Sequence, residues 1–90
     1  MMASIKRIVL DVLKPHKPGA VEFSQAIASV GDDYYVRLSV LEMDENTETI
    51  QLEITAASID FAAIQAGISA MGGSIHSVDE VDVKNDGDAG

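Results

Sequence analysis

The sequence of 90 residues contains no cysteine, and its basic residues are few. Without cysteine there is no disulfide, no thiolate-bound zinc, no iron–sulfur cluster and no cysteine nucleophile. Six Lys and Arg stand against fifteen Asp and Glu, which gives a formal charge of −9. This charge repels phosphate backbones and anionic lipids, so we expect neither nucleic acid nor a membrane as a partner.

Long apolar runs are also missing, and no stretch of the sequence is long enough to span a bilayer. The opening Met-Met-Ala-Ser-Ile-Lys-Arg leads into a strand-like pattern rather than an apolar signal core, so we expect a cytoplasmic protein. Apolar residues make up 47% of the chain, which is typical of a globular protein. We predict one domain over residues 1–84, followed by an acidic, flexible tail over residues 85–90.

The spacing of apolar residues predicts six elements. Alternation predicts strands over residues 5–14, 35–43, 49–55 and 74–83, whereas steps of three and four predict helices over 20–30 and 61–71. Gly31 and Gly72 follow the helices, where left-handed C-terminal caps are common. Ile75 and Val78 are out of phase, which predicts a bulge or a two-sided environment in the last strand.

The two halves of the sequence repeat one pattern. The helical stripe that begins at Ala20 recurs from Phe61, and the strand stripe that begins at Ile8 recurs from Ile50. Two βαβ units joined by a hairpin, with right-handed crossovers, leave one topology. We therefore predict an α+β, ferredoxin-like βαββαβ fold, with a four-stranded antiparallel sheet and two helices on one face. The term describes topology only.

This topology leaves the second face of the sheet without a covering layer. We expect Val9, Leu13, Leu41 and Met43 to lie there, which is much apolar surface to leave in water. The sheet also has two unpaired edges. Because a chain of this length buries only a small core, we expect it to form a homo-oligomer.

Two segments resemble a known family. Leu10–Pro18, with the sequence LDVLKPHKP, resembles the corresponding segment in a family of small archaeal proteins, domain-of-unknown-function family 211. Ser74–Val81, with the sequence SIHSVDEV, is similar to the C-terminal signature of that family, and the resemblance covers about residues 3–84. It implies a ferredoxin-like fold that assembles into oligomers, with no established activity. The acidic composition suits an archaeal source.

The uncovered face of the predicted sheet carries a candidate cation site. Its members are a histidine and three carboxylates that could converge on calcium or magnesium: Asp11, Glu53, His76 and Glu80. The alternative is an ion-pair network, since Arg7 and Arg37 point to the same face. Both interpretations are open at this point.

A second candidate site lies between the first strand and the first helix. Lys14, His16, Lys17 and Gly19 directly precede a helix N-terminus, where free amides and the helix dipole favour an anion. In the alternative interpretation the two prolines of this segment form a rigid turn, and its lysines are simply solvated.

Neither histidine has a serine or cysteine partner at a suggestive position, so we expect no catalytic residues and no enzyme. The residues favour a non-enzymatic, homo-oligomeric binding or regulatory module with a small ligand, either a divalent cation or an anion. The alternative is a purely structural or protein-interaction module that uses its open sheet face for assembly.

Overall fold

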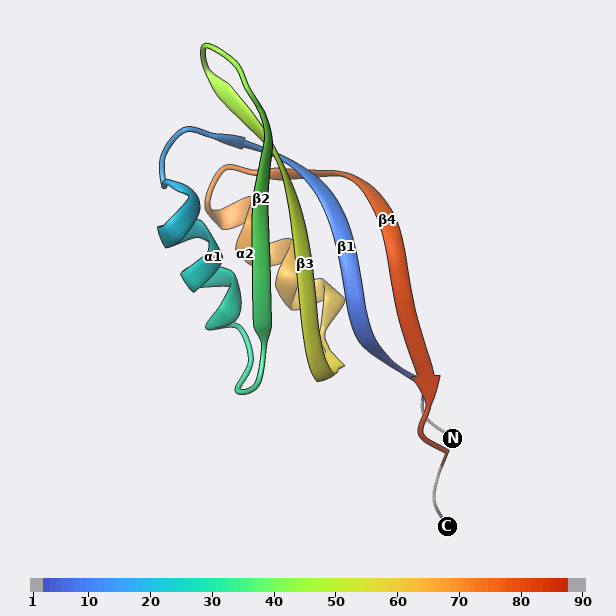
Figure 1. Ribbon diagram of the computed structural model, residues 1–90. Helices are drawn as coiled ribbons and strands as arrows, with labels where there is room; N and C mark the ends of the chain where they lie inside the picture. The colour runs from blue at the N-terminus through green and yellow to red at the C-terminus, as the bar shows by residue number, and fades with distance from the viewer. Residues whose placement is uncertain (1–2, 88–90) are drawn as a thin grey trace.

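The computed structural model describes residues 3–87. The elements follow in the order β1 (Ala3–Pro15), α1 (Ala20–Ala28), β2 (Tyr35–Met43), β3 (Thr47–Ile59), α2 (Phe61–Ala70) and β4 (Ser74–Asn85). Figure 1 shows them as one curved sheet with the helices packed behind it.

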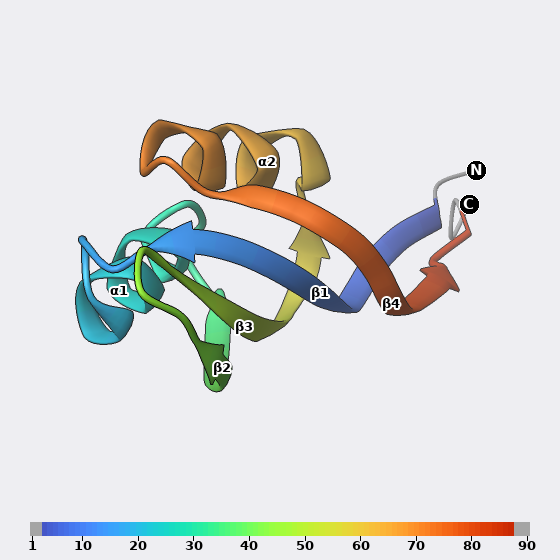
Figure 2. The same ribbon diagram turned by 90° about the horizontal axis from the view of Figure 1, so that it is seen from above.

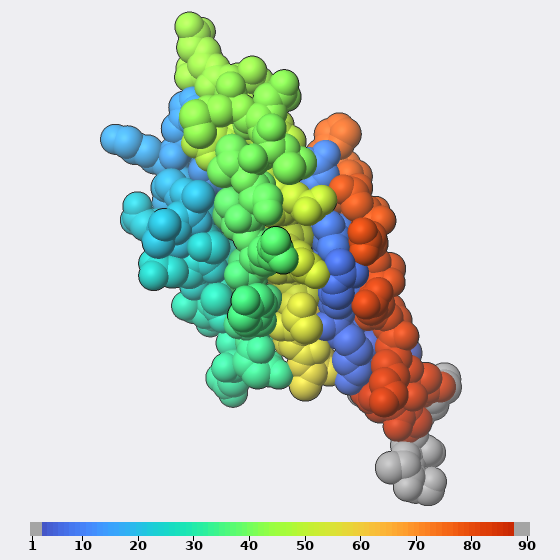
Figure 3. Space-filling model, in the orientation of Figure 1, coloured from blue at the N-terminus to red at the C-terminus, as the bar shows by residue number. Residues whose placement is uncertain are grey.

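All four strands form one antiparallel sheet in the order β2-β3-β1-β4. This order and the two helices on one face are the ferredoxin-like arrangement, which confirms the predicted fold class. Figure 3 shows the strands exposed on the opposite face, which no helix within residues 3–87 covers; we call it the open face.

The core lies between the sheet and the helices. Alternate residues of the central strands β1 and β3 meet apolar side chains of both helices, as the predicted stripes require. The core residues with at most 2% of their surface exposed are Ile8, Leu10, Val12, Phe23, Ile27, Ile50, Leu52, Ile54, Ile64 and Ile68.

The helix ends agree with the prediction for α2 and differ for α1. Gly72 follows α2 with φ of 82°, a left-handed conformation that glycine adopts without strain. At the other end of α2, the Asp60 side chain accepts a hydrogen bond of 3.1 Å from the amide of Ala63. Helix α1 ends at Ala28, and Gly31 is not left-handed. Gly31 is instead packed so closely against the ring of Tyr34 that a Cβ would overlap it.

Strand β4 contains two bulges, which confirms the irregularity predicted from Ile75 and Val78. Val12 pairs with Ile75 and Asp11 with Ser77, so His76 is an extra residue; Asp79 is extra in the same way, between Val78 and Glu80. The bulges place Ile75 and Val78 opposite helix-facing residues of β1, on the same face.

Two residues expected to be exposed on the open face differ from the expectation, Met43 in its side of the sheet and Val9 in its exposure. A register shift at Leu41 makes Met43 pair with Glu48, which turns Met43 toward the helix-facing side, because pairing in β2 moves by one residue. Val9 does lie on the open face, but it is only 3% exposed. Its neighbours in register are Glu53 and Glu80, whose long side chains flank it.

The last strand includes the first residue of the predicted tail. Strand β4 runs to Asn85, and Asp86 forms an ion pair of 3.0 Å with Lys6. The rest of the predicted tail, residues 88–90, lies outside the described residues. Within residues 3–87, both helices are too short to cross a membrane.

Candidate functional site

The four residues predicted to hold a cation fall into two groups on the open face. Arg7 donates hydrogen bonds to Glu53 over 2.5 Å and to Glu80 over 2.8 Å, and its guanidinium lies 3.9 Å from Asp82. The hydrogen bonds to Glu80 and then Glu53 raise the pKa of Arg7, so the guanidinium stays charged. Two of the four predicted ligands, Glu53 and Glu80, are therefore ion-paired with Arg7, as the ion-pair interpretation expects.

Asp11 and His76 form the other group. Oδ2 of Asp11 lies 3.7 Å from Nδ1 of His76, which is too far for a hydrogen bond. Oδ1 of Asp11 is buried, and within residues 3–87 it has no hydrogen-bond partner. Such an oxygen is costly to leave unpaired, since its hydration is lost and nothing replaces it.

These two side chains line a small hollow on the open face. It measures about 180 Å³, and its other lining residues are Leu13 and Thr49. The bulge in β4 brings His76 to this place, because the extra residue alters the direction of the strand next to Asp11. We call this hollow the Asp11 hollow. Within the described part of the chain, no group of three or more His, Asp and Glu side chains is placed to hold a metal ion, so the four predicted residues do not form one cluster.

The residues predicted to bind an anion are also divided. Lys14 is fully buried, and its ammonium donates to Glu48 over 3.1 Å and to the carbonyl of Pro15 over 2.8 Å. The ammonium also lies 5.5 Å from the centre of the Phe23 ring, within the range of a cation–π contact. The expectation of a solvated lysine is therefore wrong for Lys14.

His16 binds the same carboxylate. Its Nδ1 lies 3.0 Å from Oε2 of Glu48, and its Nε2 lies 3.0 Å from the carbonyl of Glu45. The Glu48 carboxylate and then the Glu45 carbonyl raise the pKa of His16, because both favour a ring with two protons. In turn, hydrogen bonds from His16 and Lys14 lower the pKa of Glu48. The anion that Lys14 and His16 bind in this structure is thus a side chain of the same protein.

Lys17 and Gly19 remain at the surface of the turn. Lys17 is exposed, and Gly19 is the N-cap residue of α1, without a side-chain cap. A Cβ at Gly19 would meet no atom within 4 Å, so there is free space beside this residue.

Sequence reasoning missed Glu48, although a signal was present. Extending the alternation of Ile50, Leu52 and Ile54 by one step places Glu48 on the helix-facing side. Extending the stripe of β1 in the same way places Lys14 there as well, and the two residues are partners in register.

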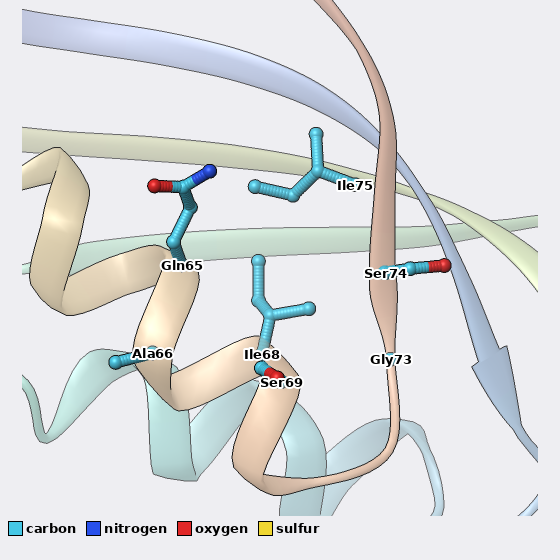
Figure 4. A pocket seen from close by; sticks show the side chains of 7 residues that line it. All are labelled: Gln65, Ala66, Ile68, Ser69, Gly73, Ser74 and Ile75. Carbon is cyan, nitrogen blue, oxygen red and sulfur yellow. The ribbon is translucent and has the colours of Figure 1, made fainter.

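A second hollow lies between α2 and the start of β4 and measures about 420 Å³. Figure 4 shows Ile68 and Ile75 beside each other in it, with Gln65 at its margin and Ser74 pointing away.

The fold and the hollows define a small α+β protein of ferredoxin-like topology, and comparison with known proteins gives its family. Residues 6–86 match the family model of domain-of-unknown-function family 211, described as uncharacterized ArCR. The chain is also similar to the uncharacterized protein MJ0319 of Methanocaldococcus jannaschii, with 41% identity over 80 residues, which covers 89% of this chain and 82% of that protein. The chain therefore belongs to this family, as its two segments suggested.

Proposed function

We propose that this protein is a non-enzymatic, homo-oligomeric binding module of the cytoplasm that binds a divalent cation in the Asp11 hollow. The observation that carries the proposal is the buried Oδ1 of Asp11, which lacks a hydrogen-bond partner within residues 3–87. A cation would satisfy this oxygen, and the imidazole of His76 stands close enough to contribute a second ligand.

The ligand atoms favour one group of cations. An imidazole nitrogen with a carboxylate oxygen suits zinc and similar transition metals better than calcium or magnesium, which prefer oxygen alone. Glu53 and Glu80, which could supply more oxygens, bind Arg7. The remaining coordination positions would be filled by water.

The cation proposal is preferred to the anion proposal because of the charges around each site. Lys14 and His16 already bind Glu48, so Lys17 and the free amides of α1 would have to bind an anion without them. The proposal is binding rather than catalysis because the histidines lie beside carboxylates and a carbonyl, and within residues 3–87 neither is hydrogen-bonded to a serine or threonine hydroxyl that it could activate.

Exposed apolar residues support self-association. Tyr35, Leu41 and Met43 of the edge strand β2 are 71%, 59% and 63% exposed. An edge strand with such side chains tends to be covered by another chain. The alternative function, a purely structural module, would use the same surface without any ligand.

Native mass spectrometry of protein purified without chelator tests the cation. After addition of zinc, we expect one zinc per subunit, removed by EDTA, and no zinc on the Asp11→Asn variant. Asp32→Asn is the matched control, because Asp32 is exposed in a distant turn and the change in charge is the same. Wild-type protein without zinc, or zinc retained by Asp11→Asn, would refute the cation site.

The same spectra test the assembly. We expect Leu41→Glu to reduce the oligomer to smaller species, and Val21→Glu to leave it intact, since Val21 is 70% exposed on helix α1 and is not part of the edge strand. A wild-type monomer would refute the assembly. An intact oligomer without zinc would leave the structural module as the function.

A further inference from the structure

Strand β4 presents an apolar surface that the protein itself leaves half uncovered. Because of the two bulges, Ile75, Val78 and Val81 all lie opposite helix-facing residues of β1. Val78 and Val81 are nevertheless 49% and 50% exposed. β4 is also the edge of the sheet, so the backbone groups on its outer side have no partner strand among residues 3–87.

The exposure follows from the lengths of the two neighbouring elements. Helix α2 has 10 residues and β4 has 12, so the helix spans about 15 Å and the strand about 40 Å. Figure 2 shows β4 passing along α2 and extending beyond it. The hollow of about 420 Å³ lies where the two elements run side by side. We call the hollow and the adjoining side of β4 the α2–β4 groove.

The groove combines the two features that bind an extended peptide. A strand edge offers backbone hydrogen bonds to an added strand, and a neighbouring hollow receives its alternate side chains. Here Ile68 and Ile75 provide the apolar surface of the hollow, whereas Gln65 and Ser69 of α2 provide polar groups at its margin (Figure 4). We propose that the α2–β4 groove binds an extended, basic segment of a partner protein, which adds a fifth strand to the sheet at β4.

The charges of β4 indicate the chemistry of this partner. Asp79, Glu80 and Asp82 lie in succession along the exposed part of the strand, in a protein with a formal charge of −9. Arg7 pairs with Glu80 and lies 3.9 Å from Asp82, but its single positive charge is shared with Glu53, so this part of the strand keeps an excess of negative charge. A segment with alternating apolar and basic residues would place the apolar ones in the groove and the basic ones near these carboxylates. The free edge of a second copy fits less well, because β2 offers these carboxylates only Arg37, together with the acidic Glu42.

Synthetic peptides of alternating lysine and valine, labelled with a fluorophore, test this inference by fluorescence polarisation. We expect the lysine–valine peptide to bind, and the glutamate–valine peptide not to bind. A lysine–valine peptide with a central proline has nearly the same charge but cannot complete a strand, so we expect it to bind about tenfold more weakly or less. Equal binding of the proline peptide would show simple charge attraction and would overturn the inference.

A matched pair of variants locates the contact. Ser69→Trp fills the hollow from the exposed surface of α2, and we expect it to weaken binding about tenfold. Ser29→Trp, at the exposed end of α1, should leave binding unchanged. Binding that is unaffected by Ser69→Trp would overturn the inference, as would a change in oligomeric state, which would show a second copy in the groove. Neither result bears on the Asp11 hollow, which lies on the opposite face.

Discussion

The helix-covered face and the open face of the sheet both join a basic residue of β1 to a glutamate of β3. On the helix-covered face the side chains of Lys14 and Glu48 are 0% and 8% exposed, whereas on the open face those of Arg7 and Glu53 are 30% and 28% exposed. If one partner of the buried pair is removed, no water can replace it, whereas water can replace a lost partner in the open pair. We therefore expect the covering layer, rather than the residue types, to decide what an ion pair contributes to the fold.

The largest effect should come from a pair of adjacent residues that point to opposite faces. Ile54 is fully buried under the helices, so Ile54→Ala should lower the free energy of unfolding by about 3–4 kcal/mol, because it leaves a cavity. Thr55 is exposed on the open face, and Thr55→Ala should change it by about 0.5 kcal/mol or less. Urea denaturation measures both. Similar losses would mean that the open face is covered, as by a second copy.

The buried ion pair should come next. Lys14→Met removes the ammonium and leaves Glu48 with only His16, so we expect a loss of about 3 kcal/mol in urea denaturation. The double variant Lys14→Met with Glu48→Leu should recover most of this loss, because no buried charge is left unpaired. If the double variant is as unstable as the single one, the pair itself stabilises the fold and the comparison of the faces fails.

A smaller effect should appear in the pH dependence of stability. Glu48 and the Glu45 carbonyl raise the pKa of His16 above its ordinary value of 6.5. A group with a raised folded pKa stabilises the protein fully below its unfolded pKa, and this contribution is lost as the pH rises through the folded pKa. The Tm of wild type should therefore exceed that of His16→Gln at about pH 6, and the difference should shrink toward about pH 9.

Glu48 should affect the stability of the protein in a second pH range, separate from that of His16. Its lowered pKa means that its contribution is lost only on acidification, below its ordinary value of 4.5. A difference between wild type and His16→Gln that is constant above pH 6.5 would show that His16 does not titrate against Glu48.

Among the variants in the ion pairs, Arg7→Gln should have the smallest effect on stability. Glu53 and Glu80 keep contact with water, so the loss should be much smaller than that of Lys14→Met in the same urea experiment. The variant also frees two carboxylates near the Asp11 hollow. If a cation binds there, its affinity should rise, which a zinc titration measures; a lower affinity would place the cation elsewhere.

Much of the fold could be predicted from the sequence, because alternation and helical spacing depend only on which side chains avoid water. The stripes of Ile8 and Ile50 placed the central strands, and the out-of-phase Ile75 and Val78 indicated the bulges. The register shift at Leu41 was not predictable, since nothing in β2 alone shows that pairing moves by one residue there. The role predicted for Gly31 was wrong for a similar reason. Glycine is required there because a Cβ would overlap the ring of Tyr34, three residues away, and not because φ is positive.

The residues of the candidate site could be predicted from the sequence, but their contacts with one another could not. The sequence by itself determined the topology, the acidic surface and the fact that Asp11, Glu53, His76 and Glu80 belong to one region. Only the tertiary structure decided that Arg7 forms ion pairs with two of these carboxylates and that Glu48 binds Lys14 and His16. It also decided that one oxygen of Asp11 has no hydrogen-bond partner within residues 3–87. The physical reason is that solvent exposure sets the periodicity of a sequence, whereas the choice among several oppositely charged partners depends on distances of a few ångströms between strands, which register and bulges fix.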